Sequence, residues 1–226
     1  MIKDFDLLQR ANNDYTTIDL EHAEELAYRE LIDSIRYIPL GDECGVMGNI
    51  ANIITYKGRF YIQEEQFDRV FIYDDTGRCL KKIDNKGRGP GEYLRIESID
   101  INTEKEELML VDGMSDKLFF YDLDGNFKSI HSIRYFQTEN TLCLRDSVFL
   151  HISAPSQNFG NEGLYGYALV LSKGNENFLK GYRYLPLQVG YKGGGQIFKG
   201  YERSCYHPIY SDTIYQILSD TTYGPI

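Results

Sequence analysis

The ten residues Asp68–Gly77, DRVFIYDDTG, recur 48 positions later as DKLFFYDLDG at Asp116–Gly125. Each copy has an aspartate, a basic residue, three apolar residues, Tyr-Asp and a closing glycine. The apolar runs before them, RFYI at 59–62 and ELML at 107–110, keep the same offset. A period of this length, filled with short strands, is typical of the blades of a β-propeller. A β-sandwich is the alternative, but it requires no internal repeat.

The repeat also predicts the strands and turns within one unit. The tetrads Asp74–Gly77 and Asp122–Gly125 have hairpin chemistry, because aspartate starts a turn and glycine accepts positive φ. In the second unit we expect four strands: Ser98–Ile101, Glu107–Val111, Lys117–Asp122 and Phe127–Ile130. Looser copies follow at Tyr167–Gly174 and Asp212–Ile217. The sequence therefore predicts an all-β propeller with about four four-stranded blades.

A leader precedes the repeats. We place it at residues 1–34 and the blades at approximately 35–86, 94–131, 132–181 and 182–226. Leu20–Ile32 has apolar residues at helical spacing and predicts a short helix, and the alternative is an extended leader. Ile35–Ile38 alternates like a strand, which Pro39 should end.

The composition fits a folded domain and excludes some partners. Hydrophobic residues make up 42% of the chain, and 19 Tyr and 12 Phe favour pleated strands. The formal charge is −10 with a pI near 4.9, and no basic stripe is present, so we expect no nucleic-acid partner. No apolar run is long enough for a membrane span.

The four cysteines, Cys44, Cys79, Cys143 and Cys205, have no zinc-site or CxxC spacing. Cys79 and Cys143 lie in apolar runs, which favours buried free thiols. One or two long-range disulfides are the alternative if the compartment is oxidising.

Gly87–Tyr93, GRGPGEY, lies between the first two units. Together with the repeats it closely resembles the GRGPGEY signature of a bacterial family of six-bladed, NHL-like β-propellers, mostly predicted secreted lipoproteins of unknown function. Thr17–Leu20, Ile35–Leu40 and Tyr210–Gln216 are similar to that family's leader, first strand and recurrent DTIY segment. The resemblance covers roughly residues 16–217.

The resemblance implies that the four blades belong to a truncated six-bladed ring. We therefore expect either an open arc that self-associates through an open blade edge, or a tighter four-bladed closure. The resemblance also implies that the protein is exported to the periplasm or cell surface, as a lipoprotein is, and that its signal has been trimmed. Residues 1–7 lack the apolar core of a signal peptide and, taken alone, predict a cytoplasmic protein.

Candidate binding residues fall in two places. Arg88, Glu92 and Tyr93 belong to the glycine-rich loop, where the alternative is that they only hold the loop together. The other candidates lie in the tyrosine-rich second half beside a Gly-Gly-Gly segment: Tyr191, Lys192 and Tyr201. Tyrosine presents an apolar ring with one polar tip, which suits sugar and peptide surfaces.

We predict no catalytic residue, metal ligand or cofactor. The four histidines are scattered, and the glycine-rich loop lacks the P-loop pattern. The leading functional hypothesis is a non-catalytic binding or scaffold propeller for a glycan, peptide or partner protein. The alternatives are a metal-dependent hydrolase or lyase with its site in the central channel, and a platform that works only within a larger complex.

Overall fold

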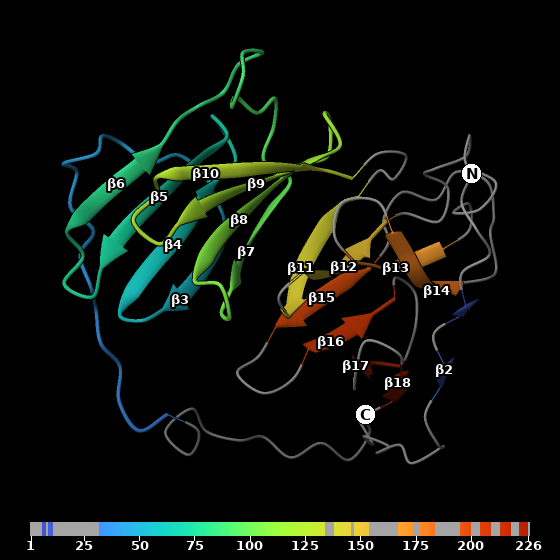
Figure 1. Ribbon diagram of the computed structural model, residues 1–226. Helices are drawn as coiled ribbons and strands as arrows, with labels where there is room; N and C mark the ends of the chain where they lie inside the picture. Colours follow the sequence, from blue (N-terminus) through green and yellow to red (C-terminus); the bar gives the residue numbers. More distant parts are fainter. Residues whose placement is uncertain are drawn as a thin grey trace.

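The computed structural model describes residues 6–7, 9–10, 32–133, 138–145, 147–153, 167–173, 177–183, 195–199, 204–208, 213–217 and 222–225. All regular structure in these residues is β-strand (Figure 1). The helix predicted over Leu20–Ile32 falls, apart from its last residue, outside them.

The first two sheets correspond to the two firm copies of the repeat. Blade 1 consists of β3 (Ile50–Tyr56), β4 (Arg59–Glu64), β5 (Arg69–Asp74) and β6 (Cys79–Ile83). Blade 2 consists of β7 (Ser98–Asn102), β8 (Glu107–Asp112), β9 (Lys117–Asp122) and β10 (Phe127–Ser132). In both, consecutive strands pair antiparallel. The predicted strands of the second unit are confirmed to within two residues.

The other two sheets each carry a fifth strand. Blade 3 consists of β11 (Asn140–Arg145), β12 (Val148–Ile152), β13 (Tyr167–Lys173) and β14 (Asn177–Arg183). Blade 4 consists of β15 (Gln196–Lys199), β16 (Ser204–His207), β17 (Tyr215–Ile217) and β18 (Thr222–Pro225). The N-terminal strands β1 (Asp6–Leu7) and β2 (Gln9–Arg10) pair in parallel with β14 and β18. The prediction of about four four-stranded blades is confirmed.

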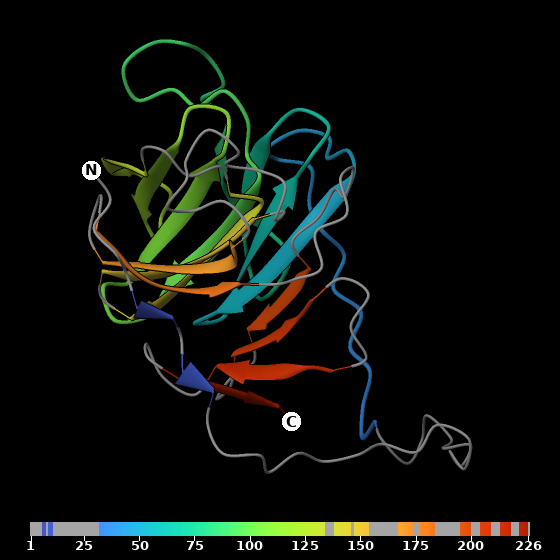
Figure 2. The same cartoon turned by 90° about the vertical axis from the view of Figure 1, so that its right-hand side faces the viewer.

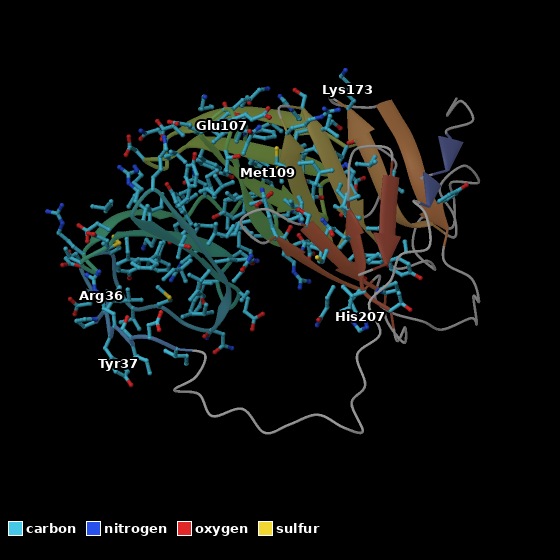
Figure 3. All side chains as sticks on the ribbon, turned by 90° about the horizontal axis from the view of Figure 1, so that it is seen from below. Arg36, Tyr37, Glu107, Met109, Lys173 and His207 are labelled. Atoms are coloured by element: carbon cyan, nitrogen blue, oxygen red, sulfur yellow. A yellow bond between two sulfur atoms is a disulfide. The ribbon has the colours of Figure 1, made fainter. Side chains whose placement is uncertain are left out.

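The blades follow one another around an arc. The first strand of each sheet, β3, β7, β11 and β15, lies towards the inside, and the last strand lies outside (Figure 1). Seen from below, blade 1 and blade 4 form the two ends of the arc (Figure 3). Among the described residues no sheet joins these ends, so the ring is open there.

The turns show why these sequences form hairpins. The Asp74 carboxylate accepts hydrogen bonds from the amides of Thr76 and Arg78, each at 3.0 Å, and Gly77 takes a φ of 88°. Together with the Thr76 hydroxyl, these donors lower the pKa of the Asp74 carboxyl to about 2. Asp122 and Gly125 repeat the arrangement one blade later.

The core lies between sheets. Alternate side chains of a strand point to opposite faces, so a blade can pack against a neighbour on each face, as blades 2 and 3 do. Between blades 1 and 2 the buried cluster contains Tyr61, Val70, Ile72 and Ile83 from blade 1, and Ile99, Ile101, Leu108, Leu110, Phe119 and Tyr121 from blade 2. Similar clusters join blade 2 to blade 3 and blade 3 to blade 4.

Among the described residues no sheet packs on the other face of blade 1, and residues 36–49, which we call the strap, cover part of it (Figure 2). The Gly41 amide donates to Gly77 O at 2.8 Å, and the Tyr73 hydroxyl donates to Gly41 O at 3.2 Å. The predicted strand at Ile35–Ile38 is wrong, because this segment carries no strand. Its sequence alternates as in a strand, but its hydrogen bond to blade 1 is donated by the Arg36 side chain, to Asp75 O at 2.8 Å.

A disulfide holds the strap on blade 1. Cys44 of the strap is joined to Cys79 of β6, with a Cα–Cα distance of 5.9 Å. The expectation that Cys79 is a buried thiol is therefore wrong, and the long-range disulfide holds for this pair. Cys143 and Cys205 remain thiols, and burial raises the pKa of the Cys143 thiol to about 12.

Candidate functional site

The glycine-rich motif lies in the connection between β6 and β7, residues 84–97, which projects from the two blades as the long green loop in Figure 2. Tyr93 anchors this loop and is fully buried. Its hydroxyl donates to Asp68 O at 2.8 Å and accepts from the Asn85 amide at 3.1 Å. Its ring meets Phe119 edge-on, with centroids 6.0 Å apart. Tyr93 thus ties the loop to both blades.

Glu92 turns inward across the glycines. Its carboxylate accepts from the Gly89 amide at 2.7 Å, and a Cβ at Gly87 would collide with it. Gly91 takes a φ of 83°, which explains a glycine at that position. The three glycines and Glu92 therefore build one compact turn.

Asp68 holds the loop through its side-chain carboxylate and its backbone carbonyl. The Asp68 carboxylate, nearly buried, pairs with the Lys86 ammonium and accepts from the Ile96 amide at 3.1 Å. With Tyr93 on its carbonyl, Asp68 contacts the loop at three points. A charge-assisted network of this kind makes the loop stiff.

Arg88 differs from its neighbours in the motif. It is exposed, and within the described residues it makes no hydrogen bond or ion pair. Of the three predicted residues of this loop, Glu92 and Tyr93 make hydrogen bonds that hold the loop in place. The Arg88 side chain faces solvent and is available to a ligand. Tyr191, Lys192 and Tyr201 lie outside the described residues.

Tyr93→Phe is expected to lower the free energy of unfolding by about 2 kcal/mol, because it leaves a buried carbonyl and an amide without their partner. Tyr61→Phe is the matched control, since the Tyr61 hydroxyl makes one part-buried bond, to Leu123 O at 3.1 Å. Urea unfolding of both variants measures the difference. Equal losses would contradict the role given to the Tyr93 hydroxyl.

The sequence did not predict the most buried ion pair of the inner strands. Asp100 of β7 is 3% exposed, and both its carboxylate oxygens accept from the Lys199 ammonium of β15, at 3.0 and 2.8 Å. Lys199 also donates to Ile101 O and Cys143 O, at 2.9 and 3.0 Å. Burial raises the pKa of the Asp100 carboxyl, and Lys199 opposes that shift. The pair joins blades 2 and 4 across the inside of the arc.

A buried polar chain runs through blade 3. His151 is fully buried, with its Nδ1 2.9 Å from Thr141 Oγ1 and its Nε2 2.7 Å from Ser172 Oγ. Burial lowers the pKa of the imidazole to about 3. A neutral ring between two hydroxyls, with no access to solvent, holds the core together and offers no site for a substrate.

Acid is expected to destabilise the protein through His151. Above pH 6.5 the imidazole is neutral in both states, whereas below it the unfolded chain takes up a proton that the folded chain cannot. The free energy of unfolding should therefore fall by up to about 1.4 kcal/mol per pH unit between pH 6.5 and 4.5. Urea unfolding across this window measures the slope. His151→Gln should flatten it, and an unchanged slope in that variant would contradict the assignment.

No group of three or more His, Cys, Asp or Glu side chains is placed to hold a metal ion in the part of the chain that the structure describes. Within the same residues no helix is long and apolar enough to cross a membrane.

Comparison with known protein families shows which family this chain belongs to. The family model "Domain of unknown function (DUF4934)" matches residues 15–224, nearly the whole chain. The chain belongs to the DUF4934 family. The sequence of this DUF4934 protein has no significant match among curated proteins.

Solved structures share the DUF4934 fold. A protein of Bacteroides fragilis NCTC 9343, provisionally named an exported protein, superposes with a TM-score of 0.75 at 19% identity, covering 85% of this chain and 54% of its own. U3-55K superposes with a TM-score of 0.51 at 10% identity, covering 78% of this chain and 53% of its own. At these identities the likeness shows the fold alone. The DUF4934 chain spans about half the length of these structures.

Proposed function

We propose that this protein is an exported, non-catalytic binding propeller that uses the 84–97 loop to hold a glycan, peptide or partner protein. The observation that carries the proposal is the exposed Arg88 guanidinium, which has no partner among the described residues, on a loop whose Glu92 carboxylate, Tyr93 hydroxyl and Lys86 ammonium are bonded. A stiff loop presents its one spare group at little entropic cost to binding.

The chemistry of Arg88 narrows the ligand. A guanidinium offers a planar fork of donors that matches a carboxylate, sulfate or phosphate group. The protein as a whole is acidic, so a highly charged anion would be repelled at long range. A glycan or peptide with one well-placed anionic group fits both facts.

Export is supported by two observations. The Cys44–Cys79 disulfide would persist in an oxidising compartment and would be rare in the cytosol. The Bacteroides fragilis structure that shares the fold carries the name of an exported protein. A six-bladed NHL-like ring and a lipoprotein anchor stay predictions.

The alternative, a metal-dependent hydrolase or lyase, finds less support. In such an enzyme we expect carboxylates on the inner strands to be available to a metal. The buried inner-strand carboxylate of Asp100 is instead neutralised by Lys199.

The test compares Arg88→Ala with Arg95→Ala, which removes the same charge from the same loop but breaks only a partly exposed pair with Glu97. Thermal-shift screening uses oligogalacturonates, singly sulfated oligosaccharides and a short acidic peptide, and titration calorimetry follows the best of them. We expect one probe to bind the wild type and Arg95→Ala, and to bind Arg88→Ala at least about tenfold more weakly. Equal binding by both variants, or no binding by any probe, would contradict the proposal.

A further inference from the structure

We infer that the free outer edge of β6 takes up an extended peptide as a further strand, with the C-terminal carboxylate of that peptide at Arg88. The inference rests on the proposed function and names its ligand, a peptide segment with a free C-terminus instead of a glycan. β6 is the last strand of blade 1, and it leads directly into the 84–97 loop that carries Arg88 (Figure 1).

The chain itself makes this kind of contact on two other blades. The last strands of blades 3 and 4, β14 and β18, each pair with an N-terminal strand: β1 lies parallel to β14, and β2 lies parallel to β18. Among the described residues no strand pairs with the outer edge of β6 or β10, the last strands of blades 1 and 2. Blades of this protein therefore accept an extended segment in parallel at the outer edge, and two such edges are free.

The outer edge of β6 is a different surface from the faces of blade 1. An edge strand turns the N–H and C=O groups of alternate residues away from its sheet, where another strand can bind them. A neighbouring blade packs on a face, as blade 2 does on blade 1, and leaves the outer edge free. Within the described residues the strap bonds to β6 only at Cys79, through Glu43 and Cys44. Beyond that point Leu80 and Lys81 are exposed.

Charge distinguishes the edge of β6 from that of β10. Residues 78–88, which contain β6 and the first part of the loop, carry five basic side chains and one acidic side chain, a net charge of +4 in a chain whose net charge is −10. Lys81 makes no ion pair with the described residues, whereas Lys128 of β10 is paired with Glu107. At contact distance, where salt screens the rest of the chain, the edge of β6 therefore favours an anionic segment.

The direction of the added strand decides what Arg88 meets. A segment that adds to β6 in parallel, as β1 and β2 do to their partners, ends beside Ile83, where the loop begins. Arg88 lies five residues further along, exposed and without a partner among the described residues. Its guanidinium matches a carboxylate. A free C-terminus supplies one carboxylate there, which meets the requirement for a single well-placed anionic group.

A peptide fits this edge better than a glycan does. The N–H and C=O groups of β6 repeat at the spacing of a sheet, and the backbone of an extended peptide has the same groups at the same spacing. Lys81, near the end of β6, offers a partner for one acidic side chain. Lysines on an edge strand also prevent unwanted pairing, so the test must show that a peptide binds along β6.

Two measurements on the whole chain test the inference. The probe is an acetylated octapeptide of alternating valine and threonine with one glutamate near a free C-terminal carboxylate. Its control is the same peptide with an amidated C-terminus. Titration calorimetry gives the affinity, and hydrogen–deuterium exchange at saturating peptide locates the contact, with β10 as the internal control. Lys173→Gln, which removes an exposed lysine of β13, is the matched control for Lys81→Gln.

We expect the free-acid peptide to bind and to slow exchange of the outward amides of residues 80–83 at least about tenfold, with β10 unchanged. Amidation of the peptide and Arg88→Ala should each weaken binding at least about tenfold. Lys81→Gln should weaken it about threefold, because exposed charge pairs contribute little, and Lys173→Gln should bind as the wild type does.

The outcomes separate this inference from the proposed function. If an oligogalacturonate or sulfated oligosaccharide binds through Arg88 while the peptide does not bind, or binds without protecting β6, the proposed function stands and the strand addition is wrong. Equal affinity of the free-acid and amidated peptides would also overturn the inference, because the C-terminus would then lie away from Arg88. If no probe of either kind binds the wild type, both fail.

Discussion

Replacing Lys199 with methionine is expected to lower the free energy of unfolding by about 3 kcal/mol. The substitution leaves the Asp100 carboxylate, 3% exposed, without its counter-ion, and it removes a donor from Ile101 O and Cys143 O. We place the loss at the low end for a broken buried pair because the Lys199 side chain is itself 28% exposed. Urea unfolding at neutral pH measures it.

Two controls isolate the buried charge. In the double variant Asp100→Asn/Lys199→Met the charge is gone, and Asn can still accept from the Cys143 amide, so most of the loss should be regained. Lowering the pH should also shrink the deficit of Lys199→Met, because protonation of Asp100 removes its charge. If the single variant were as stable as the wild type, the ion pair between blades 2 and 4 would not exist in solution.

Removing the disulfide is expected to cost about 3–4 kcal/mol. The Cys44–Cys79 pair closes a loop with a sequence separation of 35. Closing a loop of that size lowers the conformational entropy of the unfolded chain, and this loss raises the free energy of the unfolded state by the amount given. Cys44→Ser/Cys79→Ser should therefore unfold at lower urea concentration than the wild type. The double variant avoids a new free thiol.

Reduction provides the matching control. Dithiothreitol should destabilise the wild type to the level of the double variant and leave the double variant unaffected. It should also loosen the strap from Phe71 and Tyr73 and so increase binding of a hydrophobic dye. If four free thiols were titrated after denaturation of the unreduced protein, the disulfide would not form.

Local patterns predicted the strands well where each unit carries its own signals. Residues 68–77 and 116–125 each contain an apolar run, an aspartate that accepts turn amides and a glycine at positive φ. All three act within ten residues, so they can be read from the sequence. Ile35–Ile38 has the alternation without the turn, and it follows the outside of blade 1 without joining a sheet.

Contacts between distant segments could not be predicted in the same way. Cys44 meets Cys79 because the strap turns back over β5 and β6, and no spacing rule records that path. Lys199 meets Asp100 across 99 residues because the blades curve around an axis, which brings β15 opposite β7. A single lysine in a short strand does not indicate which acidic residue it will pair with.

The candidate loop was predicted in part. The glycines and the proline indicate a tight turn, but not which polar side chain turns inward. Packing decides that question: Tyr93 fills the space between blades 1 and 2, and Glu92 covers Gly87 and Gly89. Of the three predicted binding residues in this loop, only Arg88 contacts a ligand in our proposal.

Hydrogen–deuterium exchange of the dilute, monomeric protein tests most directly the central claim that blade 1 has an uncovered side. We predict that the amides of Ile50–Tyr56 exchange at least about tenfold faster than those of Ser98–Asn102, the same strand of blade 2, because among the described residues no blade packs on the side of β3 that carries Ile50 and Ile53. Equal, strong protection of the two strands in the monomer would contradict the open arc.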